Sequence, residues 1–410
     1  TVLNAQSQPS VAALNGGEFV VTWDDGTGVY AQRYDTNGNP VGGEIQVNSI
    51  VASAQVQSTV TGLNDGSFVV AWSAFSSGTA GDGSSFGITA RRFDATGNPL
   101  GGEFTVNSET ASAQAQPAIA SLADGGFVVI WASNTSGSAG DGNNNGVFGQ
   151  RYDSSGAAVG GEFQVNTFTT GAQDMPVVAG LVGGGFVVAW ESNGQDGSSE
   201  GIFAQRYDAS GTAAGDEFRV NDTTNSNESV PAITALANGG FVITWQGPSF
   251  SDGVFGQQYD ADGNRIDEQF QLNTTTSGTQ AGAVVSGLGN GNFVAAWQSS
   301  TGDGSNYGIF QQIFGDPADF STQASPVIGG LNPEVTFAEN TVNAAPQLLD
   351  ANGSVGLSDP DAADFVAAPQ WQARCWETGP LARAASHPLV AQLLEESGNG
   401  LLARLAALLV

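Results

Sequence analysis

An Asp-Gly dipeptide recurs six times along the chain in the polar loop that follows a Phe-Val-Val-x-Trp block or a close variant of it. Carboxylate oxygens on flexible Gly-rich loops are what calcium coordination uses. Asp-Gly is also a common tight-turn dipeptide, and these loops lack the alternating Asp-x-Asp-x-Asp of a dedicated calcium loop. The sequence predicts calcium as the cofactor, with turn formation as the alternative role of the same carboxylates. The candidate metal ligands are Asp25, Asp82, Asp141, Asp196, Asp252 and Asp303.

The residues needed for most other catalytic chemistry are missing. The chain contains no Lys, one His (His387) and one Cys (Cys375). A Ser or Cys nucleophile needs a nearby base that is usually His, and a phosphate-binding loop of the Gly-x-x-x-x-Gly-Lys type needs Lys. Cysteine-based zinc sites and intrachain disulfides are excluded in the same way. Carboxylate chemistry remains, because a glycosidase needs only two acids about 5 to 9.5 Å apart.

The charge of the chain narrows its partners. There are 40 acidic and 10 basic residues, all of the latter Arg, and the formal net charge is -30. Such a surface repels nucleic acid and anionic membranes, and it attracts metal cations. No stretch approaches the roughly 20 apolar residues of a membrane span. We therefore expect a secreted or cell-surface protein with no nucleic-acid partner and no membrane insertion.

One block occurs six times and must position any functional loop. Its tryptophans lie 49, 59, 59, 55 and 52 residues apart, and a polar Gly/Ser/Asp loop follows each. The copies are Phe19-Val-Val-Thr-Trp23, Phe68-Val-Val-Ala-Trp72, Phe127-Val-Val-Ile-Trp131, Phe186-Val-Val-Ala-Trp190, Phe241-Val-Ile-Thr-Trp245 and Phe293-Val-Ala-Ala-Trp297.

Each unit contains four runs rich in Val, Phe, Tyr, Ile and Trp, separated by Gly, Asn or Asp turns, which is the signal for antiparallel strands. The first run is made of Ala, Val, Ser and Gly and suits the crowded innermost position, while the second is apolar on both faces. Four strands per unit of about this length indicate propeller blades. Paired immunoglobulin-like sandwiches and a parallel β-solenoid are the alternatives. The prediction is an all-β, six-bladed β-propeller with a short irregular C-terminal extension.

A second set of aspartates ends the third run of each of five units, ahead of a Gly-containing turn. An Asp side chain can accept backbone N–H bonds two residues on, so we expect these five to cap turns. They are Asp35, Asp94, Asp153, Asp208 and Asp260.

The repeat resembles repeats of very large secreted hemolysin-type (RTX) calcium-binding bacterial proteins. The motifs that carry the resemblance are Gly201-Ile-Phe-Ala-Gln-Arg-Tyr-Asp208 and Gly160-Gly-Glu-Phe-Gln-Val-Asn166. Phe337-Ala-Glu-Asn-Thr-Val-Asn343, with Leu357-Ser-Asp-Pro-Asp361, is similar to the start of the cadherin-like domains that follow such repeats. The resemblance implies a surface or matrix protein with calcium-dependent modules, although the Gly-Gly-x-Gly-x-Asp nonapeptides of the group are absent.

Three regions are expected. Residues 1–320 form the propeller, 321–365 form a linker and a truncated cadherin-like start, and 366–410 form a Leu/Ala-rich tail that could contain short helices. The sixth unit lacks a recognisable fourth strand. We therefore expect Thr1 to Asn4 to pair with the third strand of that unit, near Ile309 to Phe314, and to close the ring.

The function that these features favour is a non-enzymatic structural or adhesive module of a calcium-binding surface or matrix protein, whose partners are glycans or other surface proteins. A carbohydrate-binding propeller lectin is the alternative, and a carboxylate-based glycan-active enzyme is the third possibility. Exposed aromatic residues that recur at one loop position would favour the lectin. Phe75, Phe86, Phe250 and Tyr307 share no common position, and this favours the structural role.

Overall fold

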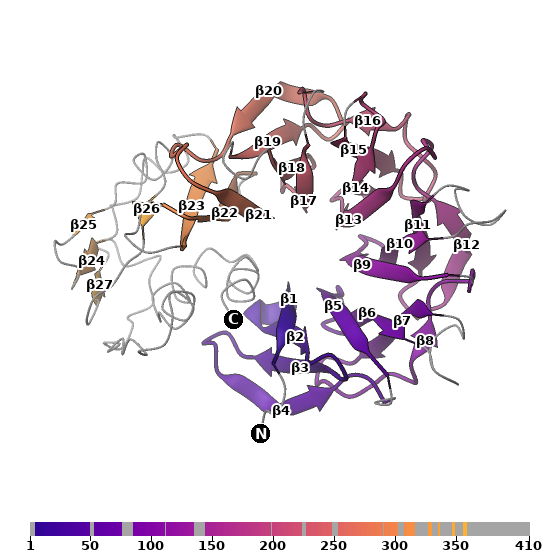
Figure 1. The fold of residues 1–410 in the computed structure, drawn as a ribbon. Coiled ribbons are helices and arrows are strands. Elements are labelled where there is room, and N and C mark those ends of the chain that lie inside the picture. Colours follow the sequence, from indigo (N-terminus) through magenta and orange to yellow (C-terminus); the bar gives the residue numbers. More distant parts are fainter. Residues whose placement is uncertain are drawn as a thin grey trace.

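The chain folds as a six-bladed β-propeller of four-stranded antiparallel sheets (Figure 1). The computed structural model describes residues 5–49, 53–75, 85–110, 112–134, 144–197, 199–223, 227–247, 253–289, 291–301 and 307–315, and four short strands between 327 and 358. The predicted architecture is confirmed. In each of the first five blades the strands follow the chain order, from the innermost to the outermost.

The first three blades have these bounds. Blade 1 contains β1 (Ser7–Ala13), β2 (Phe19–Asp24), β3 (Val29–Tyr34) and β4 (Pro40–Gln46), with one 3-10 turn, η1 (Asn15–Gly17), between its first two strands. Blade 2 contains β5 (Gln55–Gly62), β6 (Phe68–Phe75), β7 (Phe86–Phe93) and β8 (Phe104–Thr105). Blade 3 contains β9 (Gln114–Ser121), β10 (Phe127–Asn134), β11 (Asn145–Tyr152) and β12 (Ala158–Gln164).

The other three blades continue the pattern. Blade 4 contains β13 (Gln173–Gly180), β14 (Phe186–Asn193), β15 (Glu200–Tyr207) and β16 (Phe218–Arg219). Blade 5 contains β17 (Ser229–Ala235), β18 (Phe241–Gln246), β19 (Val254–Tyr259) and β20 (Arg265–Gln271). Blade 6 contains β21 (Gln280–Gly287), β22 (Phe293–Ser299), β23 (Gly308–Phe314) and β26 (Gln347–Leu348).

The prediction that the amino terminus closes blade 6 is wrong. The fourth strand of that blade is β26, which pairs with β23 through Phe310↔Leu348 and Gln311↔Gln347. An unpaired strand edge is satisfied by whichever extended segment reaches it, and here that segment follows blade 6 in the chain. Residues 1–4 lie outside the described residues.

The region after the propeller holds a small sheet. The strands β24 (Val327–Gly329), β25 (Val335–Thr336) and β27 (Gly356–Ser358) pair in the order β25-β24-β27. This sheet lies where the truncated cadherin-like start is expected, and that assignment stays a prediction. The tail expected at 366–410 lies outside the described residues.

The second strands form the core because each lies between two neighbouring blades. All but the last residue of β6 and β10 are buried, which confirms that this strand is apolar on both faces. The Trp of each blade from 2 to 6 is at most 2% exposed. In blade 1 the alternate residues Phe19, Val21 and Trp23 are only partly buried, so this outer face of β2 is less covered than its counterparts.

Small residues in the first strands let these strands converge around the centre, as predicted. A Cβ atom on Gly180 would overlap the carbonyl oxygen of Ser121 in blade 3, and one on Gly62 would overlap that of Ala13 in blade 1. Glycine is therefore required at these positions by the close approach of neighbouring backbones, since no side chain fits.

Arginines on the third strands fasten consecutive blades together. The Arg151 guanidinium donates to the carbonyl oxygens of Ala209 (3.0 Å) and Ser210 in the outer turn of blade 4. Arg92 reaches the same turn of blade 3 through Ser154 and Ser155. Charge-assisted bonds of this kind satisfy turn carbonyls that no strand partner reaches.

We predict that Arg151→Met lowers the free energy of unfolding by about 1–3 kcal/mol, because it removes the charge-assisted bonds that buried Arg151 donates to the outer turn of blade 4. Urea denaturation measures the effect. The matched control is Arg219→Met, since exposed Arg219 bonds within its own blade, to the Asn221 carbonyl, and to no other blade among the described residues. An equal loss of unfolding free energy in the two variants would contradict the role of Arg151 in joining blades 3 and 4.

Candidate functional site

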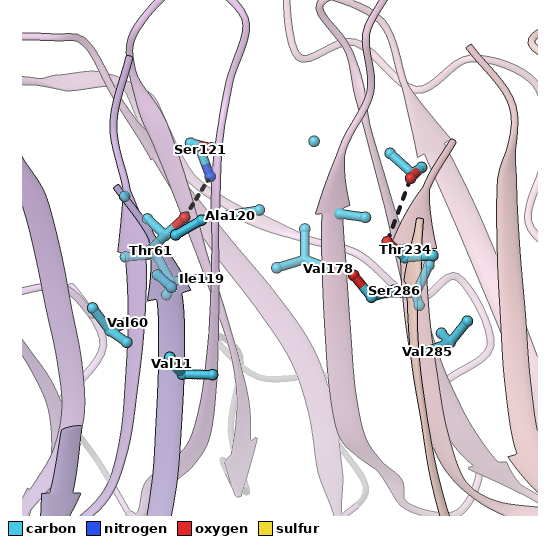
Figure 2. A pocket seen from close by; sticks show the side chains of 17 residues that line it. Val11, Val60, Thr61, Ile119, Ala120, Ser121, Val178, Thr234, Val285 and Ser286 are labelled. Atoms are coloured by element: carbon cyan, nitrogen blue, oxygen red, sulfur yellow. Dashed lines mark hydrogen bonds between the residues drawn. The ribbon is translucent and has the colours of Figure 1, made fainter. Parts of the chain in front are cut away.

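Small, uncharged side chains of the first strands surround the central channel in the described part of the chain. A cavity of about 310 Å³ lies between the first strands and is lined by small residues such as Val60, Thr61, Ser121 and Thr234 (Figure 2). None of its lining residues in the described part of the chain is Asp, Glu, His or Arg. The ionisable side chains of the described residues therefore lie outside this lining.

A backbone bulge marks one end of every first strand. The residue at the bulge has a positive φ, between 51° and 61°, and the pairing with the second strand shifts beside it. Such φ values are uncommon outside glycine, and the bulges re-aim the side chains at the strand ends. The six residues are Gln8, Gln57, Gln116, Met175, Val230 and Gly282.

Glutamine side chains link these bulges from one blade to the next. The backbone N–H of Gln57 donates to Gln8 Oε1 (2.7 Å), and that of Gln116 donates to Gln57 Oε1 (3.0 Å). The backbone N–H of Met175 donates to Gln116 Oε1 (3.0 Å). Met175 has no side-chain oxygen to continue the series. The Val230 amide donates instead to Glu191 Oε1, at 2.6 Å. A carboxylate thus replaces the glutamine at the junction of blades 4 and 5.

Glu191 has two acidic neighbours on its own blade. Asp174 is its direct cross-strand partner, so their Cβ atoms are expected about 4.5–5.5 Å apart. Glu200 lies on the adjoining strand β15, two residues from Ile202, the other cross-strand partner of Glu191. The three carboxylates therefore share one face of blade 4, at the bulge end of the channel.

The pKa of Glu191 is raised to about 6. Burial is the largest cause, the hydrogen bond from the Val230 amide opposes it, and the negative charges of Asp174 and Glu200 add to the rise. A carboxyl group with a pKa near neutrality can hold a proton and release it under working conditions, which is what a general acid requires.

These acids are departures from the repeat. At the position that follows the Trp, the other blades carry Asp24, Ser73, Ala132, Gln246 and Gln298. At the position of Asp174 they carry Ser7, Val56, Ala115, Ser229 and Ala281. A requirement of the fold would apply to all blades. Blade 1 also carries an acid after its Trp, but only blade 4 carries acids at both positions, so Asp174 and Glu191 together are the candidates for a specific function.

Asp24 in blade 1 is the other acid at the position after Trp. It is 1% exposed and accepts hydrogen bonds from Ser7 Oγ (3.1 Å) and the Gln57 amide (3.0 Å). Burial raises its pKa. Since its oxygens are engaged by neighbours in blades 1 and 2, we assign Asp24 a structural role.

The predicted metal ligands are placed only in part. Asp25 Oδ1 accepts from the Thr27 amide (3.0 Å) and the Gly28 amide (2.7 Å), so it caps the turn of its own loop. Asp196 lies in the loop between β14 and β15, and no group of three or more His, Cys, Asp or Glu in the described residues could hold a metal. Calcium binding stays a prediction. Four of the six ligands lie outside the described residues: Asp82, Asp141, Asp252 and Asp303.

The turn-capping role of the second aspartate set is confirmed. Asp153 Oδ1 accepts from the Ser155 amide (2.8 Å), the Ser155 hydroxyl (2.6 Å) and the Ala157 amide (2.9 Å). These bonds, the hydroxyl bond first, lower the pKa of Asp153, and the equivalent bonds lower the pKa of Asp94 to about 2.

The loop aromatic residues do not form a recurring platform among the described residues. The ring of Phe75 packs edge-on against that of Phe86, and Phe75 and Tyr307 are about 40% exposed on separate blades. Phe250 lies outside the described residues. Repeated sugar-stacking sites, as in a lectin, gain no support from this arrangement.

Solved structures share this fold. An α-L-arabinanase from Penicillium chrysogenum, in complex with arabinobiose, matches 75% of this chain and 93% of its own with a TM-score of 0.51 and 15% identity. An α-L-arabinofuranosidase from Fusarium graminearum matches 75% and 92%, with a TM-score of 0.52 and 11% identity. A protein of unknown function from Dyadobacter fermentans matches 75% and 94%, with a TM-score of 0.50 and 12% identity. No family model and no curated protein matches the chain.

These comparisons correct the predicted function. The expectation of a non-enzymatic structural or adhesive module is wrong, because the similar propellers include an arabinanase and an arabinofuranosidase. The expectation was based on the missing His and Lys, yet glycoside hydrolysis needs only a pair of carboxylates. Membership of the RTX group stays a prediction. Among the described residues no helix is long and apolar enough to cross a membrane.

We predict that Glu191→Gln stabilises the protein at neutral pH and not at acidic pH. The folded pKa of Glu191, about 6, exceeds the ordinary value of 4.5, so ionisation penalises the folded state. The penalty is absent below about pH 4.5, grows as the pH rises through the folded pKa, and reaches at most about 2 kcal/mol.

Denaturant curves between pH 4 and pH 7.5 measure this difference between variant and parent. Exposed Asp216 lies on the same blade, so Asp216→Asn serves as the control and should give a difference that does not change in this way. A stability difference between Glu191→Gln and the parent that stays constant from pH 4 to pH 7.5 would contradict the raised pKa of Glu191.

Proposed function

We propose that this protein is a glycan-active enzyme that cleaves glycosidic bonds with a pair of carboxylates at the bulge end of the channel, on blade 4. The observation that carries the proposal is the pair of Asp174 and Glu191, two acids that only blade 4 combines at these positions. Together with the neighbouring Glu200, Asp174 helps to raise the pKa of Glu191 to about 6. The likeness to an arabinanase and an arabinofuranosidase supports a glycan as substrate.

Glu191 takes the role of general acid. Its Oε1 accepts the bond from the Val230 amide, which fixes the carboxyl group, and within the described residues its Oε2 makes no hydrogen bond. A proton on Oε2 can then pass to the oxygen of the bond being cleaved, as the sugar leaves. Burial favours the protonated state in which this step begins.

Asp174 takes the role of the second carboxylate. Its Oδ1 accepts from Asn145 Nδ2 of blade 3 at 2.5 Å, which holds the side chain in place. From its position opposite Glu191 it can either activate a water molecule or attack the sugar carbon, the two routes known for paired acids. Its negative charge also keeps the proton on Glu191.

An extracellular site of action is part of the proposal. The net charge of -30, the single Cys and the resemblance to secreted repeat proteins support it. A polymeric glycan outside the cell would be a substrate of the proposed kind.

Hydrolysis of a panel of oligosaccharides and polysaccharides by the full chain tests the function. We predict turnover that falls at least 100-fold in Glu191→Gln and in Asp174→Asn, since removing one acid or base costs about 10²–10⁴ in rate. Asp216→Asn, an exposed acid outside the group, should keep the activity of the parent. Binding of a glycan without turnover by any form would contradict the enzyme and favour a lectin.

A further inference from the structure

We propose that the site takes an uncharged glycan and rejects sugars that carry carboxylate, sulfate or phosphate groups. The inference rests on the proposed function for its location and adds the substrate class. It follows from where the positive charges of the chain lie, and not from the similar proteins.

The sequence offers few cations to bind an anionic sugar. It has no Lys, and residues 1–365 contain seven Arg and no His. The segments of residues 1–365 that lie outside the described residues, such as 76–84 and 248–252, contain none of these residue types, and these two contain Asp. The remaining cations, three Arg and His387, all follow residue 366.

All seven arginines have protein partners. They lie on third and fourth strands, and none lies on the first strands, which surround the channel. Arg33 binds Glu18, Arg91 binds the Val47 carbonyl, Arg92 binds Ser154 and Ser155, Arg151 binds Ala209 and Ser210, Arg206 binds Ala261 and Asp262, Arg219 binds the Asn221 carbonyl, and Arg265 binds Asp222 and Val220.

The charges that act on Glu191 are both negative. Asp174 and Glu200 raise its pKa, and no arginine contributes to the shift. A ligand carboxylate beside this group would meet repulsion from two acids with no cation to offset it, and like charges a few ångströms apart in a partly buried site repel strongly. Sugar hydroxyl groups, in contrast, donate well to carboxylate oxygens.

Glutamine side chains at the bulge end of the channel also suit an uncharged sugar. Gln57 and Gln116 are partly exposed at the bulges of β5 and β9, and each uses its Oε1 to accept a backbone N–H from the next blade. Gln57 Nε2 can donate to sugar hydroxyl oxygens. Gln116 Nε2 donates one hydrogen to Met175 Sδ (3.3 Å), and its second hydrogen can serve a sugar hydroxyl. The bulge end of the channel thus presents acceptors from blade 4 and neutral donors from blades 2 and 3.

A matched pair of glycans tests the inference. The full chain is titrated calorimetrically and assayed for turnover with oligogalactose and with oligogalacturonate of equal length, at 50 and 500 mM salt. We expect the uncharged series to bind at least tenfold more tightly, and the difference to narrow at high salt because salt screens exposed charges. Glu200→Gln should also reduce the difference in affinity between the two series, whereas Asp216→Asn should not.

The outcomes separate this inference from the proposed function. Equal or tighter binding of the uronate series would overturn the inference. Turnover of that series would still agree with the proposed glycosidase function. Selective binding of uncharged sugars without turnover would uphold the inference and contradict the enzyme. Failure to bind either series would overturn both.

Discussion

The close approach of neighbouring first strands around the centre of the propeller is the constraint on which the rest of the structure depends. Their backbones come so near that Gly62 and Gly180 have no room for a Cβ atom. Convergence at this distance buries the second strands between neighbouring blades, so Trp72, Trp131 and Trp190 are fully buried. The arginines of the third strands then join the rim of one blade to the outer turn of the next. Each blade repeats the same solution, and this explains why the repeated residues are the structural ones.

Function is expected where the repeat is broken. The bulge glutamines link blades 1 to 4, and the series ends at Met175, beyond which Glu191 accepts the Val230 amide. Val230 is β-branched and holds a φ of 52°, a strained value for such a residue. The hydrogen bond from the Val230 backbone N–H to Glu191 Oε1, at 2.6 Å, helps to stabilise this backbone conformation. The same carboxylate is the one that Asp174 and Glu200 approach.

The fold could be predicted from the sequence because the same strand and turn pattern occurs six times. The Phe-Val-Val-x-Trp blocks, the small first strands and the Asp caps all gave the correct elements, since each depends on local pattern and on burial common to all blades. The fourth strand of blade 6 could not be predicted in this way. It comes from Gln347–Leu348, a pair too short to carry a strand pattern, and only the unpaired edge of β23 gives it a role.

The candidate site does not follow from the features that the six units share. The recurrent Asp-Gly dipeptides drew attention to the loops, and Asp25 proved to cap its own turn. Glu191 and Asp174 carried the opposite signal, since each is an acid where most other units have a neutral residue. Aligning the six units and looking for the exception would have found them. The raised pKa of Glu191 could not have been found so, because it depends on burial and on neighbours that only the fold brings together.

The most direct test of the account is a crystal structure of the Glu191→Gln protein with an uncharged oligosaccharide bound. We predict a glycosidic oxygen within about 3.2 Å of the side chain at position 191, with Asp174 on the other side of the bond to be cleaved. Sugar bound elsewhere on the propeller, with no density beside position 191, would contradict the assignment of the active site to blade 4.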